Sequence, residues 1–93
     1  MANGEESVAM LKAAAQTIAE RGEVYGDPLT DMARIAGMWG SILGVEIPPT
    51  KVAMCMVAVK LSRLTTSPNH ADSAIDIAGY AAILRECQKA EEE

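Results

Sequence analysis

Residues 52–59 read VAMCMVAV, a run of eight apolar residues that ends at Lys60. A helix that is apolar on nearly all sides is typical of a central, buried element. We therefore predict a helix from about Pro49 or Thr50 to Leu64 and expect it to be the most buried helix of the fold. The run is shorter than the ~18 apolar residues that a membrane span needs, so we expect a soluble, cytoplasmic protein.

The segments on either side of this run also have helical spacing. Apolar residues recur every three or four positions in the first segment, and Gly22 is expected to end that helix. A turn over residues 24–28 follows, in which Asp27 is a good N-cap and Pro28 fits the first position of the next helix. The predicted helices cover residues 6–21, 28–43, 49–64 and 70–90.

The order of these elements predicts the fold class. No segment shows the alternation of apolar and polar residues that is typical of a strand. The link before the third helix is stiffened by two prolines, and the loop over residues 65–69 is short enough to make the third and fourth helices antiparallel neighbours. We predict an all-α, four-helix antiparallel bundle in one domain over residues 1–93, with residues 1–5 and 91–93 disordered.

Composition narrows the possible partners. The net charge is −5, which argues against binding to DNA or to an anionic membrane. The fourth helix carries small residues that allow close packing, namely Ala74, Ala78, Gly79, Ala81 and Ala82. Because the apolar content is high for so small a chain, we expect a homo-oligomer, a dimer or larger, that uses this small-residue face and apolar residues of the first helix.

Lys60 and Arg63 are three residues apart, so they share a face near the end of the third helix. One interpretation is that they only interact with the helix dipole at this end. The other is an anion site for phosphate or carboxylate, in which Arg63 supplies a planar fork and Lys60 a point charge.

Asp72, Asp76 and Tyr80 follow each other at intervals of four and therefore lie on one stripe of the fourth helix. Asp76 stands between two isoleucines, where a carboxylate needs a partner. These carboxylates form either a salt-bridge cluster with the basic pair or a site for a ligand, including Mg²⁺ bound together with phosphate oxygens.

The segment RGEVYGD, residues 21–27, contains two glycines and Tyr25. It is either a plain interhelical turn or a ligand-binding turn in which Tyr25 stacks on a base. His70 is the single histidine and has no Cys/His partners in a zinc-binding pattern. Cys55 and Cys87 lack a CxxC spacing and are expected to be inert, reduced thiols.

Four stretches together resemble a family of small phage and prophage proteins of uncharacterised function. They are RGEVYGDP at 21–28, MARIAGMW at 32–39, VKLSRL at 59–64 and HADSAIDIAGYA at 70–81. More distantly, the KLSR segment and the Asp–Asp–Tyr spacing resemble the nucleotide-modification-associated domain and the MazG-like nucleoside triphosphate pyrophosphohydrolases. This resemblance implies an all-α fold, oligomerisation and a nucleotide ligand, with the phage protein acting in the host cell cytoplasm.

The chain departs from the MazG-like pattern at the metal site. Those enzymes hold Mg²⁺ with an E-x-x-E pair and an E-x-x-D pair, whereas here Ser73 replaces the first acid of the later pair. The remaining candidates for a metal are Asp31, Asp72 and Asp76, which alone would hold Mg²⁺ poorly.

Three hypotheses follow from these residues and this resemblance. The leading one is a nucleotide-binding protein, without cofactor, that recognises a nucleotide, a cyclic nucleotide or a host-defence signal and does not hydrolyse it. The alternatives are a Mg²⁺-dependent nucleotide pyrophosphohydrolase and a structural helical module without ligand. The ligand-binding residues predicted for the leading hypothesis are Arg21, Tyr25, Lys60, Arg63, Asp72, Asp76 and Tyr80.

Overall fold

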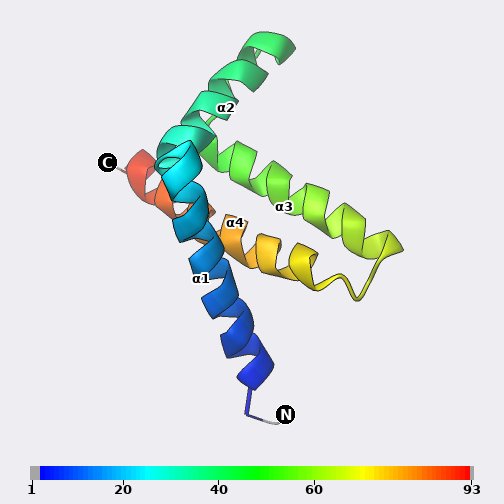
Figure 1. Ribbon diagram of the computed structural model, residues 1–93. Helices are drawn as coiled ribbons and strands as arrows, with labels where there is room; N and C mark the ends of the chain where they lie inside the picture. The colour runs from blue at the N-terminus through cyan, green and yellow to red at the C-terminus, as the bar shows by residue number, and fades with distance from the viewer. Residues whose placement is uncertain (1–2, 93) are drawn as a thin grey trace.

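A computed structural model describes residues 3–92, which form four helices and no strand (Figure 1). The helices are α1 (Glu5–Tyr25), α2 (Pro28–Leu43), α3 (Pro49–Thr66) and α4 (Ala71–Glu92). The predicted all-α class is therefore confirmed. The disorder expected at the two ends falls partly on residues 1, 2 and 93, which lie outside the described residues, whereas Glu5, Glu91 and Glu92 are helical.

The antiparallel pair of α3 and α4 is the most extensive helix contact in the structure. Thr50, at the start of α3, donates a hydrogen bond from Oγ1 to Oε1 of Glu91, at the end of α4, over 3.1 Å. At the other end of the pair, His70 accepts a hydrogen bond at Nδ1 from the backbone N–H of Ser73 and thereby caps α4. α1 packs mainly across α4, and α2 packs mainly on α3 (Figure 1).

The core is a small cluster where α2, α3 and α4 meet. Its fully or almost fully buried members are Met32, Ala36, Val52, Ala53 and Cys87. Side chains that are partly buried surround it, among them Trp39 and Tyr80. No helix among the described residues has the length and apolar character to span a membrane.

The expectation that α3 is buried on all sides is wrong for the single chain. Val52 and Ala53 are fully buried, but Met54 and Val59 are about half exposed and Cys55 is exposed. The reason is that α2 and α4 cover only one side of α3. α4 contributes more buried positions than α3, namely Ser73, Gly79 and Cys87.

The boundaries of α2 follow the sequence closely. The carboxylate of Asp27 accepts a hydrogen bond from the backbone N–H of Thr30 over 3.1 Å, which is the predicted N-cap. Pro28 occupies the start of the helix, and Gly44 ends it with a left-handed φ of 74°. The prediction of a helix over residues 28–43 is confirmed.

The first helix continues past the predicted end at Gly22. It runs to Tyr25 and ends at Gly26, whose φ is 84° and whose N–H donates to the carbonyl of Gly22 over 3.0 Å. A glycine inside a helix costs about 1 kcal/mol relative to alanine but does not stop it, so the positive φ at Gly26 decides the boundary. Arg21 and Tyr25 therefore lie one turn apart on a helix, rather than in a turn.

The small-residue face of α4 is largely used within the chain. Gly79 is buried, and α1 packs across this part of α4. The expected oligomer contact through this face stays a prediction. Ala81 and Ala82 remain exposed.

Two glycines of α2 provide a paired test of how closely the link after α2 approaches this helix. A Cβ at Gly40 would lie 2.8 Å from the carbonyl oxygen of Val45, whereas a Cβ at Gly37 would meet no atom within 4 Å. We expect Gly40→Ala to lower the free energy of unfolding by about 1 kcal/mol or more, because the link after α2 must shift. Gly37→Ala should raise it by up to about 1 kcal/mol through helix propensity. Urea denaturation measures the free energy of unfolding of both variants. Changes of the same sign in the two variants would contradict the close approach at Gly40.

Candidate functional site

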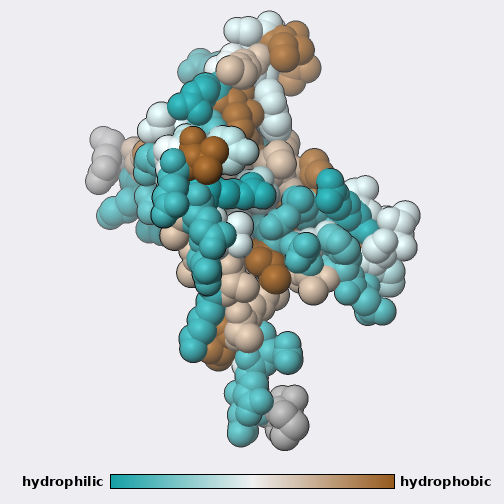
Figure 2. Space-filling view, in the orientation of Figure 1, coloured by the Kyte–Doolittle hydropathy of each residue, from teal (hydrophilic) through white to brown (hydrophobic). Residues whose placement is uncertain are grey.

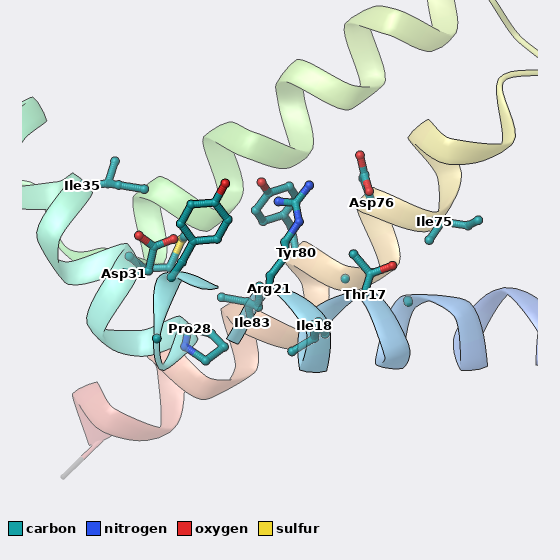
Figure 3. A pocket seen from close by; sticks show the side chains of 15 residues that line it. Thr17, Ile18, Arg21, Pro28, Asp31, Ile35, Ile75, Asp76, Tyr80 and Ile83 are labelled. Carbon is teal, nitrogen blue, oxygen red and sulfur yellow. The ribbon is translucent and has the colours of Figure 1, made fainter. Parts of the chain in front are cut away.

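A pocket of about 530 Å³ opens between α1, α2 and α4 (Figure 3). This volume is within the range of small-molecule sites. Its apolar lining comes from all three helices and the link between α1 and α2, and consists of Ala14, Ile18, Gly26, Pro28, Met32, Ile35, Ile75, Gly79 and Ile83. Its polar lining is Thr17, Arg21, Tyr25, Asp31, Asp76 and Tyr80.

The α1 wall carries Thr17, Arg21 and Tyr25 at intervals of one turn. Residues four apart on a helix share a face, so all three side chains lie on the stripe that faces α2 and α4. Thr17 donates its hydroxyl proton to the carbonyl of Ala13 over 3.0 Å, which leaves its oxygen only as an acceptor. Arg21 takes part in none of the ion pairs among the described residues, so its guanidinium is available to an anionic ligand.

The α4 wall carries Asp76 and Tyr80, also one turn apart. Oδ2 of Asp76 accepts a charge-assisted hydrogen bond from Nζ of Lys60 over 2.8 Å, and the two side chains are only 20% and 14% exposed, respectively. Lys60 itself stands behind Asp76 and is not part of the lining. Lys60 therefore engages Oδ2 of Asp76 in an ion pair and leaves Oδ1 as a free acceptor.

The α2 wall carries Asp31. Its Oδ1 accepts a hydrogen bond from Nη1 of Arg34 over 3.2 Å. Each carboxylate of the pocket thus has a cationic partner outside the lining, while Arg21 has none. The pocket consequently combines one available positive charge with two oriented acceptors, which suits a ligand with one anionic group and several hydrogen-bond donors.

The structure brings together Arg21, Asp76 and Tyr80, which were predicted from sequence (Figure 3). Tyr25, also predicted, lines the same pocket, and Lys60 is linked to it through the ion pair with Asp76. The structure does not bring in Arg63 and Asp72, which are exposed, do not line the pocket and form no ion pair within the described range. The expected four-residue cluster at the loop end is thus reduced to one ion pair. Asp72 lies outside the pocket because α1 and α4 enclose it along the middle of α4, from Ile75 to Ile83, and not at the first turn of α4.

The carboxylates considered for Mg²⁺ are not gathered into a metal site. Asp31 and Asp76 line the same pocket, but Asp72 does not, and the described residues contain no group of three His, Cys, Asp or Glu side chains that could hold a metal ion. Mg²⁺ needs several oxygen ligands in near-octahedral geometry. The residues therefore do not fit the metal that the MazG-like resemblance implies.

Sequence reasoning missed Thr17 and Gly79. Thr17 would have been found had α1 been extended to Tyr25, because residues 17, 21 and 25 then form one stripe. Gly79 is buried, yet a Cβ placed on it would meet no atom within 4 Å. It faces the open volume of the pocket, and only the packing of α1 on α4 creates that volume.

Comparison with known proteins identifies the family. Residues 9–88 match the family described as "Domain of unknown function (DUF6378)", and the chain belongs to this family. All residues that line the pocket fall within the matched range.

Two relatives are phage proteins. The chain is 40% identical over 75 residues to the "Gene 55 protein" of Mycobacterium phage L5, across 80% of this chain and 48% of the relative. It is 36% identical over 65 residues to the protein of the same name in Mycobacterium phage D29, across 70% of this chain and 43% of the relative. The chain thus spans less than half the length of these relatives. No solved structure matches it.

The Lys60–Asp76 pair can be tested by removing one charge at a time. Asp76→Ala leaves the ammonium group of Lys60 mostly buried without a partner, so we expect the free energy of unfolding to fall by about 2–3 kcal/mol. The double variant Lys60→Met with Asp76→Leu should recover most of this loss, because neither charge is then left alone. Urea denaturation of the wild type, Lys60→Met, Asp76→Leu and the double variant gives the coupling energy.

Arg63→Ala is the matched control for this cycle. Arg63 lies one turn from Lys60 but is exposed, so its removal should change stability by no more than about 0.5 kcal/mol. Equal and small losses for Asp76→Ala and Arg63→Ala would show that the ion pair contributes no more than a surface salt bridge.

Proposed function

We propose that the protein binds a nucleotide or a nucleotide-derived signal in the pocket between α1, α2 and α4, and that it does so without hydrolysis. The observation that carries this proposal is the combination of an available guanidinium, two tyrosines and two acceptor carboxylates around one apolar volume of about 530 Å³. A nucleotide has the complementary parts: a flat base, donor groups on base and sugar, and an anionic phosphate.

Each polar residue of the pocket has a distinct role in this proposal. Tyr80, which is partly buried, offers its ring to the base, and the exposed Tyr25 covers the base from the rim. Arg21 contacts phosphate through its planar fork. Asp76 and Asp31 accept hydrogen bonds from the base or the ribose with the oxygen atoms that Lys60 and Arg34 leave free.

Binding without hydrolysis is favoured by the way the carboxylates are used. Phosphoryl transfer by a metal-dependent enzyme requires the metal to be fixed by several oxygens. Asp31 and Asp76 are each paired with a cation, and Asp72 is not in the pocket. The pyrophosphohydrolase remains the alternative, and a helical module without ligand is the second alternative.

The phage relatives support a role against the host. A phage-encoded protein of this kind would act in the host cytoplasm, where binding a nucleotide or cyclic nucleotide signal would sequester it from a defence system. The net charge of −5 supports a small-molecule ligand rather than DNA or an anionic membrane.

A thermal-shift screen tests the proposal directly. Nucleoside mono-, di- and triphosphates and cyclic dinucleotides are added with and without Mg²⁺, and pyrophosphate release is measured in parallel. A ligand at 100 times its dissociation constant should stabilise the fold by about 2.7 kcal/mol. Stabilisation without pyrophosphate release is the expected result. Pyrophosphate release would favour the enzyme, and no stabilisation by any nucleotide would favour the structural module.

Pocket variants test where the ligand binds. Gly79→Leu should abolish the stabilisation by filling the pocket, since Gly79 lines the pocket and a Cβ there would meet no atom within 4 Å. Gly37→Leu is its control, because Gly37 also has open space but does not line the pocket. Arg21→Ala should weaken binding of phosphorylated ligands at least tenfold, about 1.4 kcal/mol, whereas Arg63→Ala should leave it unchanged.

A further inference from the structure

The single chain exposes more surface than a folded protein of its mass. Its accessible surface is 6364 Å², whereas a monomer of 9.8 kDa is expected to expose about 5,200 Å². The radius of gyration, 14.4 Å, likewise exceeds the ~12 Å expected for this length. The excess of about 1,200 Å² is more than the ~800 Å² that each partner contributes to a standard protein interface.

Much of the exposed apolar surface lies at the C-terminal end of α2, which projects away from the other helices (Figure 1). Ile42 is 79% exposed and Leu43 65%, and Met38 and Val45 are also mostly exposed. Hydrophobic atoms are visible at this projecting end (Figure 2). The stretch 35–45 contains no charged residue at all, which is unusual for a helix end that is left in water.

The outer side of α3 is a second exposed apolar surface. Met54 and Leu61 are about half exposed, as is Val59, and Cys55 is exposed beside them. Met54, Cys55 and Val59 belong to the apolar run 52–59, for which the sequence predicts burial on all sides. Among residues 3–92, only α2 and α4 contact α3, and they leave this side of it uncovered.

We propose that a second copy of this chain covers these two surfaces, so that the projecting end of α2 and the outer side of α3 form a two-fold symmetric dimer interface. The area argues for such a partner, since the excess exposure is large enough to supply one side of a stable interface. The absence of charge over residues 35–45 argues for self-association, because identical surfaces can meet across a two-fold axis without placing like charges opposite each other.

The proposed interface is separate from the nucleotide pocket. None of Met38, Ile42, Leu43, Val45, Met54 and Leu61 lines the pocket. A dimer would therefore carry two pockets that both remain open, and this proposal does not depend on the proposed ligand.

Sedimentation velocity of the full chain tests the interface. We expect the wild type to sediment at about 20 kDa, twice the mass of one chain, and Ile42→Glu to sediment at about 10 kDa. Leu11→Glu is the matched control: Leu11 on α1 is also mostly exposed and lies outside the proposed interface, so this variant should remain a dimer. Far-ultraviolet circular dichroism verifies that each variant is helical.

Three outcomes of this experiment would overturn the proposal. They are a wild type that stays at about 10 kDa at all concentrations, an Ile42→Glu variant that remains a dimer, and dissociation by Leu11→Glu in place of Ile42→Glu. The last would instead place the contact on α1.

Cys55 provides a second measurement on the wild type. Cys87 is fully buried, and burial together with the neighbouring carboxylates of Glu91, Glu86 and Asp27 raises the pKa of its thiol, so it reacts slowly. Alkylation of the folded protein therefore reports on Cys55. We expect alkylation on the order of tenfold slower in the wild-type dimer than in Ile42→Glu, because the partner covers α3. Equal rates would show that α3 is not part of the interface.

Discussion

The ion pair between Lys60 and Asp76 fixes how α3 and α4 lie against each other. Asp76 lies in an apolar part of α4, and a mostly buried carboxylate is stable there only with a cationic partner. The ion pair sets the axial position of α3 relative to α4 near the loop that joins them. The hydrogen bond from Thr50 to Glu91 joins the start of α3 to the end of α4 in the same register. With this register set, Tyr80 and the free oxygen of Asp76 are available to the pocket.

The length of α1 then completes the pocket. Because α1 continues through Gly22, its polar stripe of Thr17, Arg21 and Tyr25 reaches across α4 to the beginning of α2. Gly79 borders the open volume between α1 and α4, where a Cβ would meet no atom within 4 Å. One helix boundary thus decides whether Arg21 faces solvent in a turn or faces the two carboxylates.

The small core explains why the chain leaves so much apolar surface exposed. Among the described residues, the buried apolar side chains are few and mostly small: Ala14, Met32, Ala36, Val52, Ala53 and Cys87. A cluster of this size gives a domain modest stability, so further burial between copies would add to it. The pocket and the α2–α3 surface are the two features on which the proposals for this chain rest.

The sequence by itself determined the helical class, the limits of α2 and the pairing of α3 with α4, because capping residues, prolines and a short loop act locally. It also indicated Asp76 and Tyr80 by their spacing on one helix, and Arg21 and Tyr25 by a segment with two glycines, and these four residues line the pocket. Only the tertiary structure decided that α1 passes Gly22, that Arg63 and Asp72 stay outside the pocket, and that one side of α3 is uncovered. These features depend on where one helix crosses another, and the spacing of residues along a single helix does not contain that information.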